Sequence, residues 1–171
     1  DAIRGNAAPP VTALQAATVM AWLELGLASA REHRELGLSG RPQGAPRAIV
    51  LALHGLNDYR QAFAGTGCFL AARGIATYAY DQRSFGSTRQ RGIWPGTERL
   101  KEDARTVAAL LRQAHPGQPL YLLGESMGGA VAMSMLAETP EAADGTILAA
   151  AAVWGRVTMN PLQHAALWLL A

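Results

Sequence analysis

The feature that most constrains the fold of this chain is an alternation of short apolar runs with helical patterns from residue 48 onward. Short apolar runs of this kind are typical of strands buried on both faces of a sheet. The predicted strands are residues 48–54, 75–81, 120–123 and 146–153, and the predicted helices are residues 61–73, 97–115 and 127–138. This order predicts an α/β fold, with a mostly parallel sheet flanked by helices and joined by right-handed crossovers.

Local signals mark the ends of the predicted helices. Gly74 is an ordinary stop for the first helix, and Pro116-Gly117 ends the second. Thr97 is a candidate N-cap for the second helix, whose apolar residues fall on one face. That face consists of Leu100, Ala104, Val107, Ala108 and Leu111.

The first 45 residues are ambiguous. Leu23, Leu25 and Leu27 alternate as in a strand, but Leu14, Thr18, Trp22 and Leu25 also fit helical spacing. We favour a strand hairpin at the edge of the sheet, followed by a linker over residues 41–46.

Composition excludes few functions. The chain has 171 residues, of which 50% are hydrophobic, and this suits one globular domain. Its net charge of +2, without a basic cluster, gives no argument for nucleic acid or an anionic membrane as a partner. No apolar run reaches the ~18 residues that a transmembrane helix needs.

The single cysteine, Cys68, rules out an internal disulfide, and we expect it to be a small buried apolar residue. No Cys/His set has metal-ligand spacing, so we expect no metal and no cofactor. The chain begins with Asp1, so a start methionine or signal peptide has been removed or omitted. The compartment therefore stays open between the cytoplasm and, if a signal was removed, the periplasm or the exterior.

A candidate nucleophile lies between the strand at 120–123 and the helix at 127–138. Residues 124–129 read Gly-Glu-Ser-Met-Gly-Gly and match the G-x-S-x-G nucleophile elbow. A sharp turn there forces Ser126 into a strained backbone conformation, and Gly124 and Gly128 leave room for it. The alternatives are an incidental serine in a glycine-rich turn and a phosphate-binding loop. The second fails because neither G-x-x-x-x-G-K-[ST] nor a helix-opening G-x-G-x-x-G is present.

A second candidate element is His54-Gly55-Leu56, at the carboxyl end of the first buried strand. Acyl transfer needs two backbone N–H groups that stabilise the developing oxyanion. We expect one from Met127, the residue after the nucleophile, and the other from Leu56. His54 precedes the nucleophile and lies beside this loop, so we expect a structural role for it and for Gly55.

With these elements located, the chain from about Ala48 onward resembles the monoacylglycerol lipase and lysophospholipase branch of the α/β hydrolases. The resemblance rests on residues 53–59, 80–87, 123–130 and 152–156. It implies an eight-stranded sheet, a helical cap after the sixth strand, and hydrolysis of lipid or other carboxylic esters. Two departures stand out. Ser84 occupies a usual glycine position, which costs stability if its φ is positive, and Ala151 replaces a usual proline.

The resemblance also implies a catalytic acid and histidine after the cap, in the order Ser, Asp, His, and only Asp144 and His164 follow Ser126 in that order. Asp144 precedes the last predicted strand, roughly 25 Å from the reactive edge, so we expect a turn residue. His164 lies in an amphipathic stretch, where we favour a cap helix packing on the sheet over a general base. Leu167 and Trp168 are candidates for an acyl pocket. We therefore divide the chain into 1–154, the N-terminal part of the core, and 155–171, the beginning of a cap.

The sequence thus favours a serine carboxylester hydrolase acting on a small ester or lipid, with Ser126 as nucleophile. It also favours an α/β-hydrolase fold that continues in a complementary C-terminal portion. Peptidase or perhydrolase chemistry on the same fold is one alternative. A non-catalytic fragment that binds a lipid or a partner is the other, because the acid and base are absent.

Overall fold

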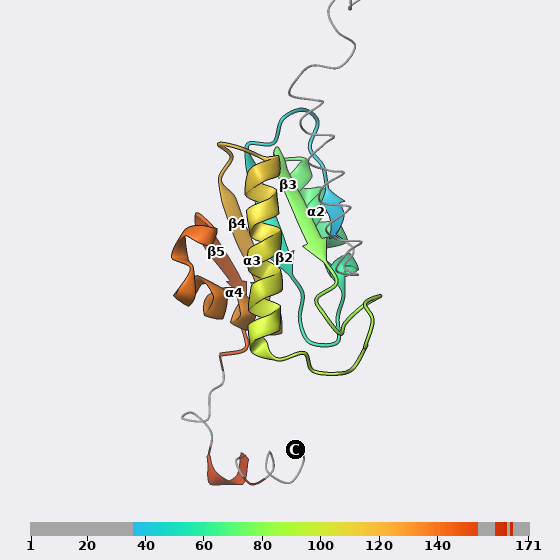
Figure 1. Cartoon of the computed structure of the whole chain (residues 1–171). Helices are drawn as coiled ribbons and strands as arrows, with labels where there is room; N and C mark the ends of the chain where they lie inside the picture. Colours follow the sequence, from blue (N-terminus) through green and yellow to red (C-terminus); the bar gives the residue numbers. More distant parts are fainter. Residues whose placement is uncertain (1–35, 154–159, 164, 166–171) are drawn as a thin grey trace, which may run out of the picture.

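The computed structural model describes residues 36–153, 160–163 and 165. Within them a five-stranded sheet has the order β1-β3-β2-β4-β5 (Figure 1). The strands are β1 (Leu36–Gly40), β2 (Ala48–Leu53), β3 (Ile75–Tyr80), β4 (Leu120–Glu125) and β5 (Gly145–Ala149). Neighbours pair in parallel except β1, which lies antiparallel to β3 at one edge. The predicted mostly parallel sheet is therefore confirmed.

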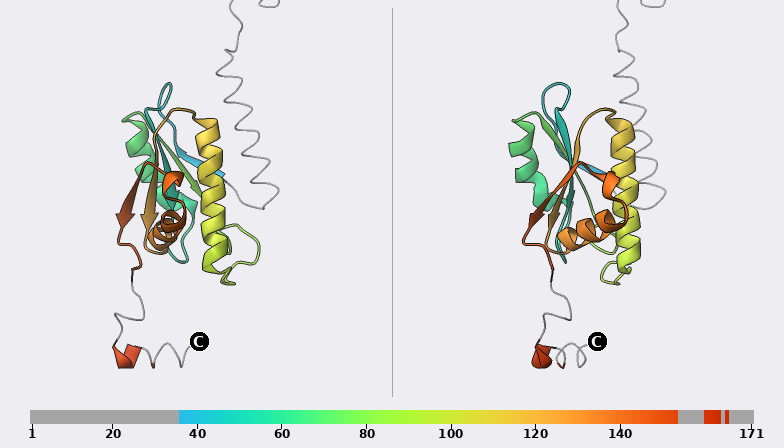
Figure 2. Two further views of the ribbon diagram at one scale, coloured as in Figure 1. Left: turned by 60° about the vertical axis from the view of Figure 1, so that its left-hand side comes forward. Right: turned by 90° about the vertical axis from the view of Figure 1, so that its left-hand side faces the viewer.

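Helices cover both faces of the sheet. The connection from β2 to β3 contains η2 (Arg60–Phe63) and α2 (Ala64–Ala71) on one face. On the other face lie α3 (Thr97–Ala114) and α4 (Met127–Glu138), as the two views of Figure 2 show. The short η3 (Pro140–Ala142) leads into β5. None of the helices in this part of the chain is long and apolar enough to cross a membrane.

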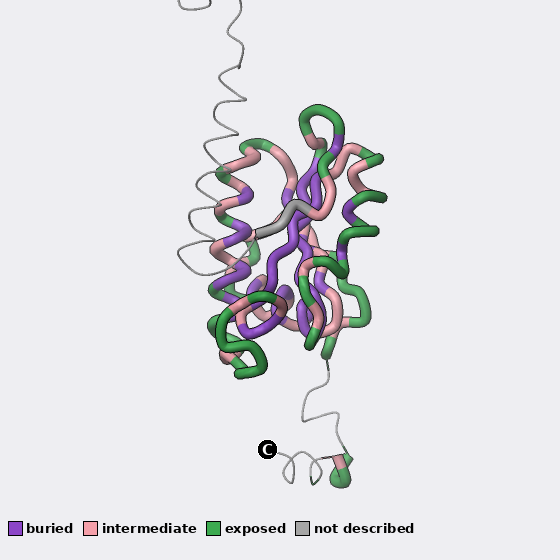
Figure 3. Tube along the Cα trace, turned by 90° about the vertical axis from the view of Figure 1, so that its right-hand side faces the viewer, coloured by how far each residue is buried: buried purple, intermediate pink, exposed green. Residues whose placement is uncertain are grey.

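The core lies between the central strands and α3 and α4 (Figure 3). All six residues of β2 are buried, as its continuous apolar run predicts. All five residues of the predicted apolar face of α3 are also buried, so that face is confirmed. The N-cap of α3 is Gly96 and not Thr97, so that expectation is wrong. Gly96 takes φ 87°, where a residue with a side chain would be strained.

Two further expectations are corrected. The last strand ends at Ala149 instead of residue 153, because Ala150 takes φ 46° and leaves the extended conformation. Cys68 is exposed on α2, whose buried residue is Gly67. The suggested hairpin around Leu23–Leu27 lies outside the described residues, although β1 does form an edge strand.

Candidate active site

The candidate site lies where β2 and β4 end side by side at the carboxyl edge of the sheet. Their parallel register pairs Leu53 with Gly124, so the segments that follow both strands leave the sheet next to each other. The chain runs from β2 to β3 on one side, and from β3 across to β4 on the other. Such a reversal of strand order is the usual position of a ligand site in open α/β sheets.

Ser126 occupies the turn between β4 and α4. Its φ of 48° and ψ of −114° lie in a region that residues with side chains rarely adopt. Neighbouring backbone groups hold this conformation. The Ser126 N–H donates to the carbonyl of Ala149 at 3.0 Å, and its carbonyl accepts from the N–H of Ala152 at 2.9 Å. The strained backbone expected from the motif is thus present, and strain of this kind is concentrated at functional sites.

The two glycines of the motif allow this turn through close backbone approach. A Cβ on Gly124 would lie 2.5 Å from the Cα of Gly129. A Cβ on Gly128 would lie 2.0 Å from the carbonyl oxygen of Leu53. Since both neighbours are backbone atoms, neither position has room for a side chain. The expected steric reason for these glycines is confirmed.

The segment after β2 lies directly beside the serine. A Cβ on Gly55 would lie 3.4 Å from the Cβ of Ser126 and 4.0 Å from its Oγ. Met127 is the first residue of α4, where backbone N–H groups lack helical partners and the helix dipole favours negative charge. Met127 is buried, whereas the Leu56 side chain is exposed. Residues 55–56 and the start of α4 thus flank Ser126.

His54 is fully buried, and both of its ring nitrogens are engaged. Its Nε2 accepts a hydrogen bond from the Gln82 N–H at 3.0 Å, so Nδ1 carries the proton and donates to the Gly55 carbonyl at 2.8 Å. The Gln82 side-chain amide also donates to the His54 carbonyl at 2.7 Å. Burial lowers the pKa of His54 and favours the neutral ring. His54 therefore joins the segments after β2 and β3, which is the structural arrangement that the sequence suggested.

Asp81 organises the start of the loop between β3 and α3, and sequence reasoning assigned it no role. Its carboxylate accepts from the N–H of Arg60 at 2.9 Å and from both the N–H and hydroxyl of Ser87 at 2.8 Å. Burial would raise the pKa of Asp81, but these hydrogen bonds and the Arg60 cation outweigh it and hold the pKa below its ordinary value. The motif over residues 80–87 was the signal that could have pointed to this network.

Ser84 lies in the same loop with φ 74°. The expected cost of a residue other than glycine at a positive φ therefore applies here. Arg83, next to it, forms a bidentate ion pair with the buried Asp103 of α3, with distances of 2.8 and 3.0 Å. This pair ties the beginning of the loop to α3.

The acid and base candidates do not join Ser126 in the described structure. Asp144 accepts from the Leu120 N–H at 2.7 Å and pairs with Arg112 at 3.2 Å. These two interactions hold the pKa of Asp144 below its ordinary value at the amino edge of the sheet. Because β5 has five residues and not eight, Asp144 is about 16 Å from the carboxyl edge, nearer than expected but still out of reach.

The remaining candidates are either remote or undescribed. His115 ends α3 and its Nε2 lies 2.8 Å from the Tyr78 hydroxyl, at the same amino edge as Asp144. His164, Leu167 and Trp168 lie outside the described residues, as does most of the cap segment 155–171. Among residues 36–153, 160–163 and 165, no group of three or more His, Cys, Asp or Glu is arranged to hold a metal ion.

The sheet order, the flanking helices and the strand–serine–helix turn together define an α/β hydrolase. More specifically, the chain belongs to the serine aminopeptidase S33 family, whose profile matches residues 44–171.

Relatives by sequence carry lipase names. The chain is 27% identical to monoglyceride lipase of Homo sapiens, an alignment covering 63% of this chain and 36% of the relative. It is also 27% identical to monoacylglycerol lipase of Mycolicibacterium smegmatis, covering 77% of this chain and 50% of the relative. The chain thus spans half or less of the length of these relatives.

Solved structures agree on the fold. A soluble variant of monoglyceride lipase from Saccharomyces cerevisiae, in complex with a substrate analogue, superposes with a TM-score of 0.65 at 22% identity. That match covers 80% of this chain and 48% of the yeast chain. The monoacylglycerol lipase of Paleococcus ferrophilus gives a TM-score of 0.63 at 20% identity, covering 80% of this chain and 50% of that one.

Proposed function

We propose that this protein is a serine carboxylester hydrolase in which Ser126 is the nucleophile. The observation that carries the proposal is the strained Ser126 backbone between β4 and α4, with Gly55 packed against its side chain. This geometry supports a hydroxyl presented at the carboxyl edge of the sheet, at the N-terminus of a helix. An incidental serine in a turn would not need the close backbone approaches at Gly124 and Gly128.

In the proposed reaction the Ser126 Oγ attacks the ester carbonyl and gives its proton to a base. The backbone N–H groups of Leu56 and Met127 stabilise the tetrahedral oxyanion. Collapse of that intermediate expels the alcohol, which takes the proton from the base, and leaves an acyl group on Ser126. Water activated by the same base then releases the acid and restores the serine.

The base in this proposal is a histidine outside residues 36–153. His54 does not fit because its Nε2 lone pair is held by the buried N–H of Gln82. His115 does not fit because it lies at the amino edge with Tyr78. Residues 36–153 alone should therefore show little turnover, limited to the ~10³–10⁴-fold acceleration that binding and an oxyanion hole supply without a triad.

The substrates we propose are monoacylglycerol-like or lysophospholipid-like esters. The names of the human and mycobacterial relatives support a lipid monoester. Exposed apolar side chains at the same edge of the sheet also support it: Leu56 follows β2, and Val153 follows β5. Leu167 and Trp168 remain candidates for an acyl pocket.

Peptidase chemistry is the second candidate, because the matched family is described as a serine aminopeptidase. The natural protein should be assayed on a monoacylglycerol and on an aminoacyl anilide. We expect hydrolysis of the ester, a loss of more than about 10³-fold in kcat for Ser126→Ala, and little change for the control Ser134→Ala within α4.

Three outcomes would contradict the proposal. Turnover confined to the anilide would favour the peptidase. Ester turnover by Ser126→Ala equal to that of the unmodified protein would show that Ser126 is not the nucleophile. Retention of the biological effect by that same variant would favour a non-catalytic, lipid-binding or partner-binding protein.

A further inference from the structure

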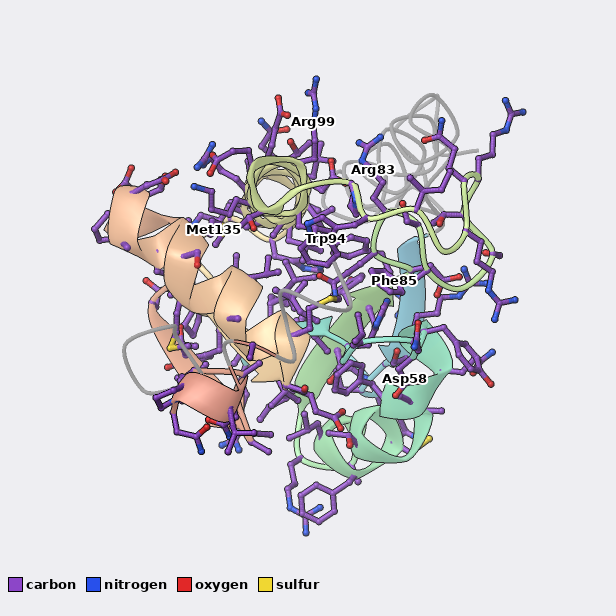
Figure 4. All side chains as sticks on the ribbon, turned by 90° about the horizontal axis from the view of Figure 1, so that it is seen from below. Asp58, Arg83, Phe85, Trp94, Arg99 and Met135 are labelled. Atoms are coloured by element: carbon purple, nitrogen blue, oxygen red, sulfur yellow. The ribbon has the colours of Figure 1, made fainter. Side chains whose placement is uncertain are left out.

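The loop between β3 and α3 presents two large apolar side chains to solvent. Residues 87–94, which we call the Arg-Trp loop, end in Ile93 and Trp94. Ile93 is 63% exposed and Trp94 is 57% exposed, whereas most large apolar residues of the sheet and helices are buried. Figure 4, viewed onto this end of the molecule, shows Trp94 beside the start of α3. Two large apolar residues exposed next to each other in one loop are a candidate contact surface.

The same loop carries two arginines for which the described residues supply no ion-pair partner. Arg89 and Arg91 are exposed, and neither forms an ion pair within the described part of the chain. By contrast, Arg83 pairs with Asp103 and Arg99 with Glu102. No aspartate or glutamate occurs between residues 82 and 96. The net charge of +2 conceals this uneven distribution, because acids elsewhere cancel most of the cations.

Two hydrogen bonds hold the Arg-Trp loop at the edge of the sheet where Ser126 lies. Its first residue, Ser87, is bonded to the Asp81 carboxylate at 2.8 Å. Further along, the Gly92 N–H donates to the Ser84 carbonyl at 3.0 Å. It belongs to residues 81–96, which connect the carboxyl end of β3 to the start of α3, so it lies at the carboxyl edge of the sheet. Its exposed side chains therefore lie on the same edge of the sheet as the Ser126 turn.

We propose that the Arg-Trp loop docks the protein on an anionic lipid surface. Trp94 and Ile93 enter the interfacial region, where an indole combines an apolar ring with a polar N–H. Arg89 and Arg91 face the lipid phosphates, which supply the complementary charge. Docking in this orientation turns the carboxyl edge of the sheet toward the lipid. The binding itself requires neither Ser126 nor hydrolysis, so it goes beyond the proposed function.

Co-sedimentation with vesicles tests the proposal, using the natural protein with Ser126→Ala as background so that no lipid is consumed. The probes are vesicles of phosphatidylcholine alone and vesicles containing about a third phosphatidylglycerol. We expect tighter binding to the anionic vesicles. Arg89→Gln/Arg91→Gln should weaken that binding by about thirtyfold, at roughly fivefold per charge. Trp94→Ala should weaken binding to both vesicle types by roughly tenfold.

Matched controls lie elsewhere on the surface. Phe69, on α2, is also 57% exposed and stacks under Arg73. Phe69→Ala and Arg47→Gln/Arg73→Gln should leave vesicle binding unchanged. Equal binding to neutral and anionic vesicles would overturn the proposal, as would equal losses in the control variants. A fall in the midpoint of thermal unfolding for Trp94→Ala, with binding retained, would instead show that another segment of the protein covers the loop.

Discussion

Gly128→Ala adds one methyl group at the tightest point of the serine turn. The new Cβ would lie 2.0 Å from the carbonyl oxygen of Leu53, a backbone atom of the central strand β2. Carbon and oxygen atoms need more than about 3 Å, so α4 and β2 must separate by about 1 Å. Because β2 is buried along its whole length and paired on both sides, it cannot yield locally.

The magnitude follows from two opposing effects. Overpacking against a rigid neighbour costs about 3 kcal/mol, the upper part of the usual range. Alanine is favoured over glycine in a helix by about 1 kcal/mol, which offsets part of that cost. We therefore expect the free energy of unfolding to fall by about 2 kcal/mol. Gly65→Ala in α2 is the control, because no heavy atom lies within 4 Å of its added Cβ. It should raise the free energy of unfolding by up to about 1 kcal/mol.

Urea denaturation followed by circular dichroism measures both variants. With a slope of about 2 kcal/mol per molar urea, the midpoint should fall by about 1 M for Gly128→Ala and rise by about 0.5 M for Gly65→Ala. If the two substitutions raised the midpoint alike, α4 would not approach β2 as closely as the structure shows. The steric explanation of Gly128 would then be wrong as well.

Three further predictions follow from the described residues. Ser84→Gly should raise the free energy of unfolding by up to about 1 kcal/mol, because φ 74° suits glycine, whereas the control Ser134→Gly within α4 should lower it; equal effects in urea titrations would refute this. Burial holds the pKa of His54 in the folded state below 6.5, so the neutral ring contributes fully to the free energy of unfolding above pH 6.5, and this contribution is lost as the pH falls toward the folded-state pKa. Urea titrations between pH 7 and 5 should show this fall in the free energy of unfolding, and His54→Asn should lack it. Ile147 is 54% exposed on β5, and within residues 36–153 this strand is paired on one side only. Because an apolar edge strand favours association between copies of a chain, Ile147→Lys should reduce self-association measured by light scattering, and an unchanged signal would contradict this.

The parts of the fold that repeat a simple pattern could be predicted from the sequence. The apolar run of β2 and the five-residue face of α3 were identified because burial on two faces, or along one stripe, leaves a periodic signal. The helix α4 has its predicted bounds of 127–138 because the serine turn fixes where it begins.

Features that depend on close approach between distant segments left no such signal. The buried residue of α2 is Gly67, whose added Cβ would lie 2.3 Å from the carbonyl oxygen of Ser39. A contact made by a glycine leaves no hydrophobic signal in the sequence. The more hydrophobic neighbour, Cys68, was therefore wrongly expected in the interior. After Thr146 the predicted strand is apolar through residue 153, and only the backbone turn at Ala150 shows where β5 ends.

In the candidate site, too, local features could be predicted from the sequence and contacts between distant segments could not. The motif was sufficient to expect the backbone strain at Ser126 and a structural role for His54. The hydrogen bonds of Gln82 with His54, and of Asp81 with Arg60, join the segments that follow two different strands, β3 and β2. Such pairs are set by sheet order, which a single sequence does not specify.

The most direct test of the central claim is reaction of the natural protein with a fluorophosphonate, followed by intact-mass measurement and peptide mapping. Our account predicts one adduct per molecule, located on Ser126 and absent from Ser126→Ala. It also predicts that the adduct forms in Ser134→Ala. An adduct on another residue, or none on a protein that hydrolyses esters, would contradict the assignment of Ser126 as the nucleophile.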